Sequence, residues 1–147
     1  MSITMPRNCV MDASALIKYV YDEEGTPIVE QLIETLLNDD DATIYVPDLL
    51  FIECANILWK KVRRNEVDTE TAEKDLADLA SLELNATPCA DLMTRALSLA
   101  CKYGISAYDA CYVALAERHS IPLVTADDHL IHKLAGTGYL VLSLAAL

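Results

Sequence analysis

The sequence predicts an α/β domain of three layers, in which a short, mostly parallel sheet of five strands lies between two layers of helices. Three observations favour this fold. Short apolar runs alternate with helical runs along the chain. The apolar runs are hydrophobic on both faces, which is typical of a sheet that is covered on both sides. Helices separate these runs, as parallel strands require.

Five apolar runs are short enough to be strands. We expect strands at NCVMD (8–12), TIYVP (43–47), LNATPC (84–89), IPLVTA (121–126) and YLVLS (139–143). Helical runs lie between them, at residues 14–23, 26–39, 48–65, 69–83, 90–104, 106–120 and 127–136. One or two helices therefore connect each strand to the next, which is the connection that parallel neighbours need.

Residues that favour helix ends mark several of these boundaries. Four polar residues are expected as N-caps, because their side-chain oxygens can accept hydrogen bonds from free backbone N–H groups: Ser14, Thr26, Asp48 and Ser106. Pro27 then occupies a first helical position, where its missing N–H costs nothing. Gly104 is expected to end the run at 90–104.

Length and hydrophobicity limit the class of protein. The chain has 147 residues, the size of one domain, so we expect a single domain over residues 1–147. Hydrophobic residues make up 53% of it, but no apolar run approaches the roughly 18–20 residues of a membrane span. The apolar excess therefore suggests a covered core and a subunit interface. The start of the sequence has no signal-peptide pattern, so we expect a cytoplasmic protein.

Charge and cysteine usage exclude further classes. The formal net charge of −12 argues against broad, nonspecific nucleic-acid binding, which needs Lys and Arg to neutralise phosphates. The five cysteines are odd in number and include no C-x-x-C pair, which indicates reduced, mostly buried thiols. His129 and His132 could share a helix face, but two histidines without a cysteine partner are a weak metal motif.

Four carboxylates fall at strand ends or helix starts. Asp12 ends the first strand, and Asp127 follows the fourth. Glu53 and Asp109 lie near the starts of two of the expected helices. Ligand sites of open parallel sheets lie beyond the carboxyl ends of the strands, so all four side chains can meet at one edge of the sheet.

Each of these residues also has a purely structural interpretation. Asp12 could be a turn residue, and Asp127 could cap the last helix. In S-A-Y-D, Asp109 lies three residues after Ser106, as in a capping box. Glu53 could lie on the one wet stripe of the helix that contains LLFIECANILW. Glu53 and Asp109 fit these interpretations less well, because apolar residues surround both and a carboxylate there needs donors or a cation.

A hard divalent cation would meet that need. Mg²⁺ and Mn²⁺ prefer carboxylate and water oxygens, so a set of acids alone favours these metals over zinc. Such a site can lower the pKa of a bound water and stabilise charge on a phosphate during in-line displacement. Three polar residues near this edge could orient ligands or bind the waters of the metal, although plain capping and packing would also explain them: Ser14, Asn56 and Thr125.

Four segments make the chain resemble a PIN domain, and more narrowly the VapC-type toxin ribonucleases of toxin–antitoxin pairs. They are VMDASALIKYV around Asp12, FIECANILWK around Glu53, SAYDACYVALAE around Asp109 and LVTADDHL around Asp127. Each segment is short, but their order, spacing and total length all fit, over about residues 7–143. The resemblance implies a five-stranded parallel sheet, a homodimer and inhibition by a small cognate antitoxin protein.

The resemblance also implies an activity, that of a Mg²⁺- or Mn²⁺-dependent endoribonuclease that hydrolyses single-stranded RNA. Its catalytic and metal-binding cluster would consist of Asp12, Glu53, Asp109 and Asp127. The first three would hold one metal ion, directly or through water, and Asp127 would hold that ion or a second one. Ser14 and Thr125 would lie near the cluster. An activated water would attack the phosphodiester in line, leaving a 5′-phosphate and a 3′-hydroxyl. In TADD the family pattern T-x-D selects Asp127, and Asp128 is left as an acid at a helix start.

A nuclease must also hold the RNA backbone, and the chain offers one basic segment for this. The segment closes the helix at 48–65 and contains Lys60, Lys61, Arg63 and Arg64. It should lie about 10 Å or more from Glu53, at a rise of roughly 1.5 Å per residue. The structural alternative is a solvated helix end whose cations complement the helix dipole.

Two other functions compete with the ribonuclease. The chain could be a PIN-like module that keeps an intact acidic site but acts mainly as a protein- or RNA-binding partner. The high net acidity favours that alternative, and the complete acidic cluster disfavours it. The chain could also be a phosphoryl-transfer protein with Asp12 as its nucleophile. That chemistry calls for a second Asp two residues later or a well-placed Lys, and the residue two positions after Asp12 is Ser14.

Overall fold

The computed structural model describes residues 6–21 and 26–147. Its strands form one five-stranded sheet, as the sequence predicts. The strands are β1 (Asn8–Met11), β2 (Thr43–Pro47), β3 (Asn85–Thr87), β4 (Leu123–Thr125) and β5 (Val141–Ser143). All five predicted strands are confirmed, and all but β2 are shorter than the apolar runs that predicted them.

The sheet has the strand order β3-β2-β1-β4-β5, and every neighbouring pair is parallel. The chain builds outward from β1 to β2 and β3, then returns to the other side of β1 with β4 and β5. The winding direction therefore reverses between β1 and β4, where open α/β sheets bind their ligands. The register aligns Met11 with Val124, so Asp12, which follows β1, and Thr125, the last residue of β4, lie on adjacent strands at the carboxyl edge.

Helices connect all of these strands. In the described ranges the α-helices are α1 (Ala13–Leu16), α2 (Thr26–Leu37), α3 (Leu49–Arg63), α4 (Thr69–Ala80), α5 (Met93–Tyr103), α6 (Ala107–His119) and α7 (Asp128–Leu134). Short 3₁₀ turns lie at Ile17–Tyr19, Cys89–Asp91 and Leu144–Ala146. The predicted helices are confirmed in number and order from α2 onward, with ends that differ by a few residues.

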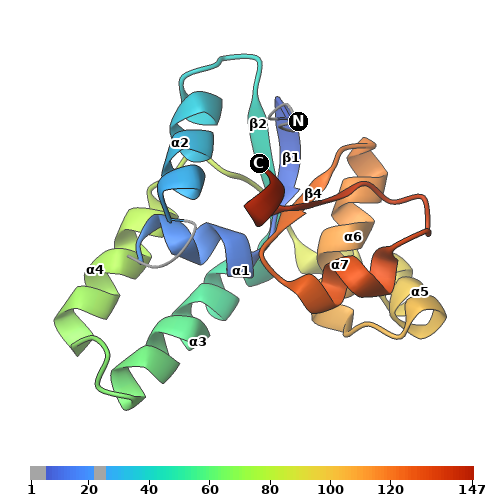
Figure 1. Cartoon of the computed structure of the whole chain (residues 1–147). Coiled ribbons are helices and arrows are strands. Elements are labelled where there is room, and N and C mark those ends of the chain that lie inside the picture. Colours follow the sequence, from blue (N-terminus) through green and yellow to red (C-terminus); the bar gives the residue numbers. More distant parts are fainter. Residues whose placement is uncertain (1–5, 22–25) are drawn as a thin grey trace.

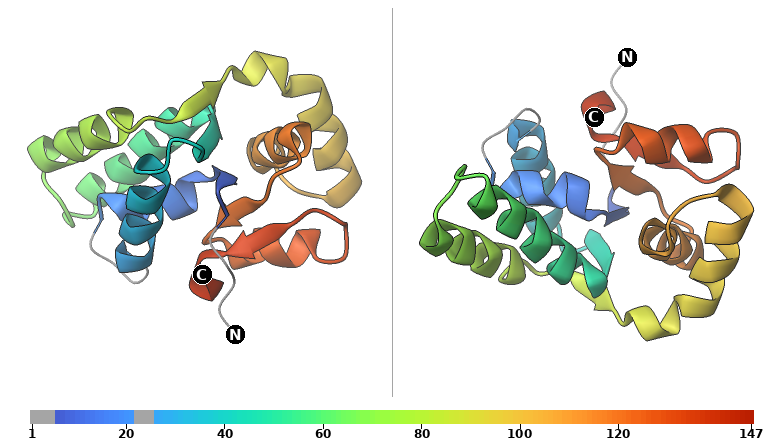
Figure 2. Two further views of the ribbon diagram at one scale, coloured as in Figure 1. Left: turned by 90° about the horizontal axis from the view of Figure 1, so that it is seen from above. Right: turned by 90° about the horizontal axis from the view of Figure 1, so that it is seen from below.

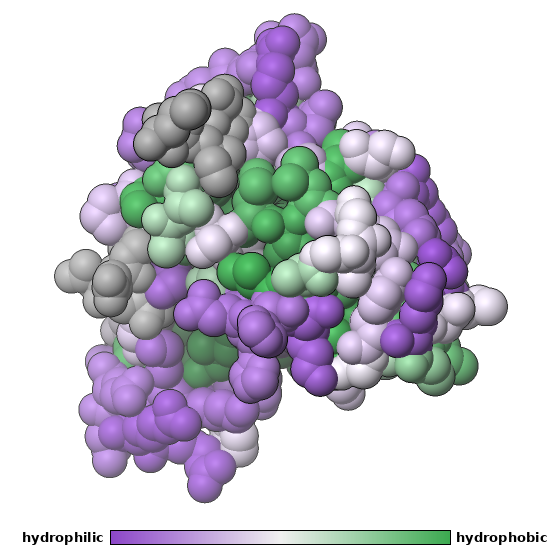
Figure 3. All heavy atoms as spheres, turned by 45° about the vertical axis from the view of Figure 1, so that its right-hand side comes forward, coloured by the Kyte–Doolittle hydropathy of each residue, from purple (hydrophilic) through white to green (hydrophobic). Residues whose placement is uncertain are grey.

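The helices form the two outer layers that the sequence predicts. Figures 1 and 2 show α1 to α4 on one side of the sheet and α5 to α7 on the other. The pair α3 and α4 forms a hairpin that projects away from the sheet, and α5 packs along α6. On the face drawn in Figure 3, hydrophobic side chains gather in the middle, and hydrophilic ones cover the tip of the α3–α4 hairpin at the lower left.

The core depends most on α6, which packs against β1, β2 and β4 and against α5. All seven residues from Ala110 to Ala116 are buried. A helix that is apolar on every side belongs in the interior of a domain. Because α6 is held in this way, the position of its first turn, which contains Asp109, is fixed relative to the sheet.

Two capping assignments made from the sequence are wrong. Asp12, not Ser14, caps α1, and its side chain accepts a hydrogen bond from the backbone N–H of Ala15. Asp48 precedes α3 but makes no capping hydrogen bond, because its carboxylate accepts the backbone N–H of Cys89 at 2.9 Å. The first error is one of position, because the cap lies two residues earlier than expected, whereas Asp48 has a partner 41 residues away that sequence spacing does not reveal.

The helix expected at 14–23 is also shorter than predicted. The observed helix, α1, is a single turn, and the 3₁₀ turn Ile17–Tyr19 follows it. Residues 22 and 23 of the predicted helix lie outside the described residues. The capping role expected of the Thr26 side chain lies outside them as well.

Other expected helix ends are confirmed. The Ser106 hydroxyl accepts the backbone N–H of Asp109 at 3.0 Å, and Gly104 ends α5 with a left-handed φ of 67°. Asp68, which the sequence analysis did not single out, caps α4 through the backbone N–H of Thr71. Of these residues, Ser106 fixes the start of α6, and Gly104 forms the turn that leads into it.

The cysteines agree only in part with the prediction. All five are free thiols, and Cys9, Cys54 and Cys111 are buried. Cys89 is half-buried and Cys101 is exposed. None of the helices in the described ranges has the length and apolar content that crossing a bilayer requires.

Substitutions of Ser106 test whether its side chain caps α6. Replacing Ser106 with Ala should lower the free energy of unfolding by about 1 kcal/mol, because the backbone N–H of Asp109 loses its acceptor. Ser106→Asp should retain most of that stability, since a carboxylate can accept the same bond. Urea unfolding of the three proteins would measure both effects. An alanine variant as stable as the parent would contradict the assigned cap.

Candidate active site

The Asp12 carboxylate lies at the carboxyl edge of the sheet and is almost fully buried, with 5% exposed. It accepts three hydrogen bonds. The Ser14 hydroxyl donates to Oδ1 at 2.6 Å, and the backbone N–H of Ala15 donates to the same oxygen at 3.1 Å. The hydroxyl of Thr125, which is itself fully buried, donates to Oδ2. Asp12 therefore joins the end of β1 to α1 and to β4.

These hydrogen bonds replace only part of the water that Asp12 has lost. Burial raises the pKa of its carboxyl to about 6, from an ordinary value of 3.8. The three hydrogen-bond donors lower that pKa, and the nearby Asp109 raises it further. The charged form is thus held in an unfavourable place, and a cation beside it would relieve the cost.

Ser14 and Thr125 were predicted to support the cluster, and the structure brings them together. Their hydroxyl oxygens lie 3.2 Å apart. Ser14 Oγ accepts the backbone N–H of Ala126 at 3.0 Å, and Thr125 Oγ1 accepts that of Asp127 at 3.0 Å. These bonds hold the turn after β4 against Asp12. The two hydroxyls therefore fix how the chain passes from β4 to Asp127.

Asp127 has both of the roles that the sequence allowed for it. It caps α7, because its Oδ1 accepts the backbone N–H groups of His129 at 3.0 Å and Leu130 at 3.4 Å. It also lies close enough to raise the pKa of Asp109. Asp128, in contrast, is exposed at the start of α7. Of the two adjacent acids, Asp127 is the one coupled to Asp109.

Asp109 is the residue to which the other three acids are coupled. Burial raises the pKa of its carboxyl, the charge of Asp127 raises it further, and the Ser106 hydroxyl lowers it. The charge of Asp109 in turn raises the pKa of Asp12 and of Glu53. The structure thus brings all four predicted acids into one neighbourhood around the first turn of α6.

Glu53 lies on α3, with its carboxylate half-buried. Burial raises its pKa, a hydrogen bond from Tyr112 lowers it, and the charge of Asp109 raises it. The Tyr112 hydroxyl donates to Glu53 Oε1 at 2.6 Å. Glu53 is therefore more than a residue on the solvated stripe of α3. Its carboxylate accepts a hydrogen bond from Tyr112, a buried residue of α6.

A hollow of about 640 Å³ opens beside Glu53. Its lining residues are Ile52, Glu53, Ala55, Asn56, Trp59 and Tyr108. Three of the large side chains are well exposed: Ile52 at 68%, Trp59 at 52% and Tyr108 at 66%. Asn56, which was predicted to orient a ligand, is exposed on the same side of α3 as Glu53. The hollow gives a ligand direct access to one carboxylate of the cluster.

Sequence reasoning missed two aromatic contributors to this site. Tyr112 lies one helical turn after Asp109, a spacing that places both side chains on the same face of a helix. Tyr108 precedes Asp109 and faces the hollow beside Glu53. The spacing could have indicated Tyr112, but its partner Glu53 is 59 residues away in the sequence.

The chemistry of these donors fits a hard divalent cation. Four carboxylates supply only oxygen ligands, and the couplings around Asp109 raise the pKa of three of them. The side chains are not drawn together into a closed ligand set: in the described ranges no three Asp, Glu, His or Cys side chains form a metal-holding group. A cation here would therefore also need water ligands or a small movement of side chains.

The basic segment lies at the far end of α3. Lys61 is 3.7 Å from Glu66 and lies over the ring of Tyr21, so its charge is already partnered. The Arg63 guanidinium lies 4.8 Å from the ring centre of Trp59, which lines the hollow. Arg63 thus links the basic segment to the hollow beside Glu53.

Comparison with known proteins identifies the family. The PIN domain family model matches residues 9–136. Ribonuclease VapC3 of Pyrobaculum aerophilum is 33% identical over 126 residues, which cover 84% of this chain and 92% of that protein.

Solved structures share the fold. Mycobacterium tuberculosis VapC20, described as a sarcin-ricin loop cleaving toxin, superposes with a TM-score of 0.67 at 14% identity, over 90% of this chain and 96% of its own. A toxin–antitoxin complex from Klebsiella pneumoniae contains a chain with a TM-score of 0.64 at 15% identity, over 95% of this chain and 99% of its own. The sequence matches and the shared fold together show that the chain belongs to the PIN domain family, with a VapC ribonuclease among its relatives.

Proposed function

We propose that the protein is a metal-dependent endoribonuclease that hydrolyses single-stranded RNA, and that it is the toxin of a type II toxin–antitoxin pair. One observation carries the proposal: Asp12, Glu53 and Asp127 are all close to Asp109 at the carboxyl edge of a PIN-domain sheet. A relative named as a VapC ribonuclease, 33% identical over most of the chain, supports the same activity. The alternative of a binding module is less well supported, because no acid of the cluster is missing.

The proposed cofactor is Mg²⁺ or Mn²⁺, held by oxygen atoms of Asp12, Glu53, Asp109 and Asp127. When bound, such an ion makes a water molecule more acidic and stabilises charge on the phosphate. The chain's own contribution is to place Asp12, Glu53 and Asp127 near enough to Asp109 for their charges to interact with it. Ser14 and Thr125 keep Asp12 in place through its two oxygens. The cap made by Asp127 fixes that side chain against α7.

The proposed path for RNA is the hollow beside Glu53. Trp59 and Tyr108 offer exposed aromatic faces on which unpaired bases can stack. Arg63 lies over Trp59 and brings a positive charge to the same surface. These groups would bind single-stranded RNA locally, although the chain as a whole has a net charge of −12.

Two protein partners are proposed, a second copy of the chain and a small antitoxin. One of the solved structures that share this fold is a toxin–antitoxin complex, which supports the antitoxin. Exposed apolar side chains support protein contacts: Met93 and Leu97 on α5 are 44% and 62% exposed. We propose further that residues 1–147 form one domain that acts in the cytoplasm, where its RNA and antitoxin would be present.

The activity is tested with purified protein free of antitoxin and a mixed pool of single-stranded RNA. Cleavage should occur with Mg²⁺ or Mn²⁺ and stop in EDTA. Asp109→Asn and Asp12→Asn should each reduce cleavage by at least about 100-fold, because each replaces a charged carboxylate ligand of the metal with a neutral amide.

Asp128→Asn is the matched control for these variants. It removes the same charge from the acid next to Asp127, outside the coupled cluster, and should leave cleavage within about twofold of the parent. Folded protein that cuts no RNA with either metal would contradict the proposal. Equal loss of cleavage in all three variants would contradict the assignment of the site.

The acid cluster also predicts how stability depends on pH without metal. The pKa of Asp12 is about 6 in the folded protein and 3.8 ordinarily, so its protonated form stabilises the fold at low pH. That stabilisation is fully present below pH 4 and is lost as the pH rises through 6, at a total cost of about 3 kcal/mol. Glu53 and Asp109 contribute with the same sign, because burial raises their pKa values too.

Asp12→Asn should remove most of this loss. Relative to the parent protein, its free energy of unfolding in EDTA should rise by about 2 kcal/mol between pH 4 and pH 7. Asp128→Asn should show no such change. Urea unfolding at a series of pH values measures all three proteins, and a constant difference between Asp12→Asn and the parent would show that burial does not raise the pKa of Asp12.

A further inference from the structure

We infer that Tyr112 is a positioning residue, which aims the Glu53 carboxylate at the metal site through its hydroxyl. The inference rests on the proposed function and adds to it a residue outside the four acids. Tyr112 touches no substrate in this account. It acts on the reaction only through Glu53.

The geometry of the pair supports this role. Tyr112 is 1% exposed and lies in the fully buried part of α6, three residues after Asp109. Its hydroxyl donates to Glu53 Oε1 at 2.6 Å, from the same helix that carries Asp109. This one bond therefore fixes the carboxylate of α3 relative to the carboxylate of α6.

Without this bond, burial and charge repulsion would favour a movement of the Glu53 carboxylate away from Asp109. Its carboxylate is half-buried, and the charge of Asp109 repels it. The hollow lined by Ile52, Asn56 and Trp59 offers an open space beside it, into which a free carboxylate could turn. In the described part of the chain, Tyr112 makes the one hydrogen bond recorded to the Glu53 side chain. Removal of the hydroxyl should therefore let Glu53 turn from Asp109 toward solvent.

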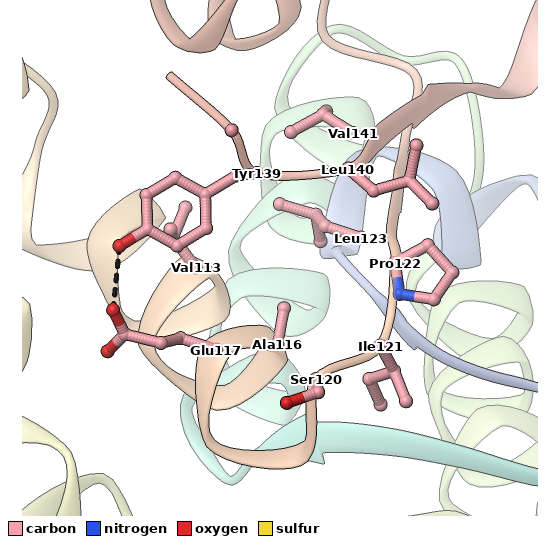
Figure 4. Close-up of a pocket in the computed structure, with 11 residues that line it drawn as sticks. Val113, Ala116, Glu117, Ser120, Ile121, Pro122, Leu123, Tyr139, Leu140 and Val141 are labelled. Atoms are coloured by element: carbon pink, nitrogen blue, oxygen red, sulfur yellow. Dashed lines mark hydrogen bonds between the residues drawn. The ribbon is translucent and has the colours of Figure 1, made fainter.

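A competing explanation is that the bond only satisfies a buried phenol and stabilises the fold. The chain contains a control for that explanation. The Tyr139 hydroxyl donates to Glu117 Oε1 at 2.7 Å, as Figure 4 shows, and Glu117 also lies on α6. This second Tyr–Glu pair borders a different hollow, of about 330 Å³, between α6 and the segment that leads into β5. Both pairs join a Tyr hydroxyl to a Glu carboxylate through a residue of α6. They differ in that Arg95 also binds Glu117, at 2.6 Å, and in that only the Tyr112–Glu53 pair contains an acid of the cluster.

The experiment compares Tyr112→Phe with Tyr139→Phe in the full-length protein. Mn²⁺ binding is measured by electron paramagnetic resonance of the free ion, without RNA, and thermal unfolding is followed by circular dichroism. Tyr112→Phe should weaken Mn²⁺ binding by about 10-fold, the usual effect of removing a partner that orients a metal ligand. Tyr139→Phe should bind Mn²⁺ as the parent does, although it too loses the hydrogen bond to its glutamate, together with a longer one from Arg95 at 3.5 Å.

A double-mutant cycle separates positioning from general destabilisation. Glu53→Gln should weaken Mn²⁺ binding, and adding Tyr112→Phe to it should cause no further loss, because the carboxylate that Tyr112 aims is gone. Independent losses that multiply in the double variant would overturn the inference. Equal Mn²⁺ affinity in Tyr112→Phe and the parent would overturn it as well, and so would a Tyr112→Phe protein that has no cooperative unfolding transition.

The result also separates this inference from the proposed function. A parent protein that neither binds Mn²⁺ nor cleaves RNA would overturn both. A parent protein that binds Mn²⁺ and cleaves RNA, together with a Tyr112→Phe variant that does both equally well, would overturn the positioning role and leave the proposed function intact.

Discussion

The rest of the site depends on one constraint, the burial of a carboxylate at the end of the central strand. Asp12 leaves β1 between β2 and β4, where water has almost no access. The fold supplies donors from both sides, with Ser14 and Ala15 on α1 and Thr125 on β4. Each donor also fixes a segment of backbone. The residues that make Asp12 tolerable are thus the same ones that shape the turn leading to Asp127.

The second half of the site depends on a helix rather than on the sheet. Because α6 is buried along seven consecutive residues, it cannot shift without disturbing the core, and its first turn presents Asp109 at a fixed place. Tyr112, one turn later, extends the control of α6 to Glu53 on α3. The packing of α6 in the core thus offsets the repulsion between Asp109 and Glu53 and keeps both carboxylates in place. Charges of like sign that the fold holds together are typical of a site made to bind a cation.

Much of the fold could be predicted from the sequence, because its signals are local. The run TIYVP predicts β2 with the bounds that the structure has, and the Ser106 cap is correct. Errors arose where a polar side chain has a distant partner. Asp48 lies at the start of α3 but accepts the backbone N–H of Cys89, which is 41 residues away. Ser14 accepts the backbone N–H of Ala126, which is 112 residues away, and Asp12 caps α1 in its place. The four acids were recognised by pattern and are neighbours in the structure, whereas Tyr112 was missed because only tertiary structure pairs it with Glu53.

The central claim is that the acids around Asp109 hold a divalent cation. The most direct measurement is anomalous X-ray scattering at the manganese edge from crystals grown at pH 7 with Mn²⁺. The account predicts a manganese peak at bonding distance from Asp109 and from at least one of Asp12, Glu53 and Asp127. Well-ordered crystals with no peak at this edge of the sheet, or with a peak bound only elsewhere on the chain, would contradict it.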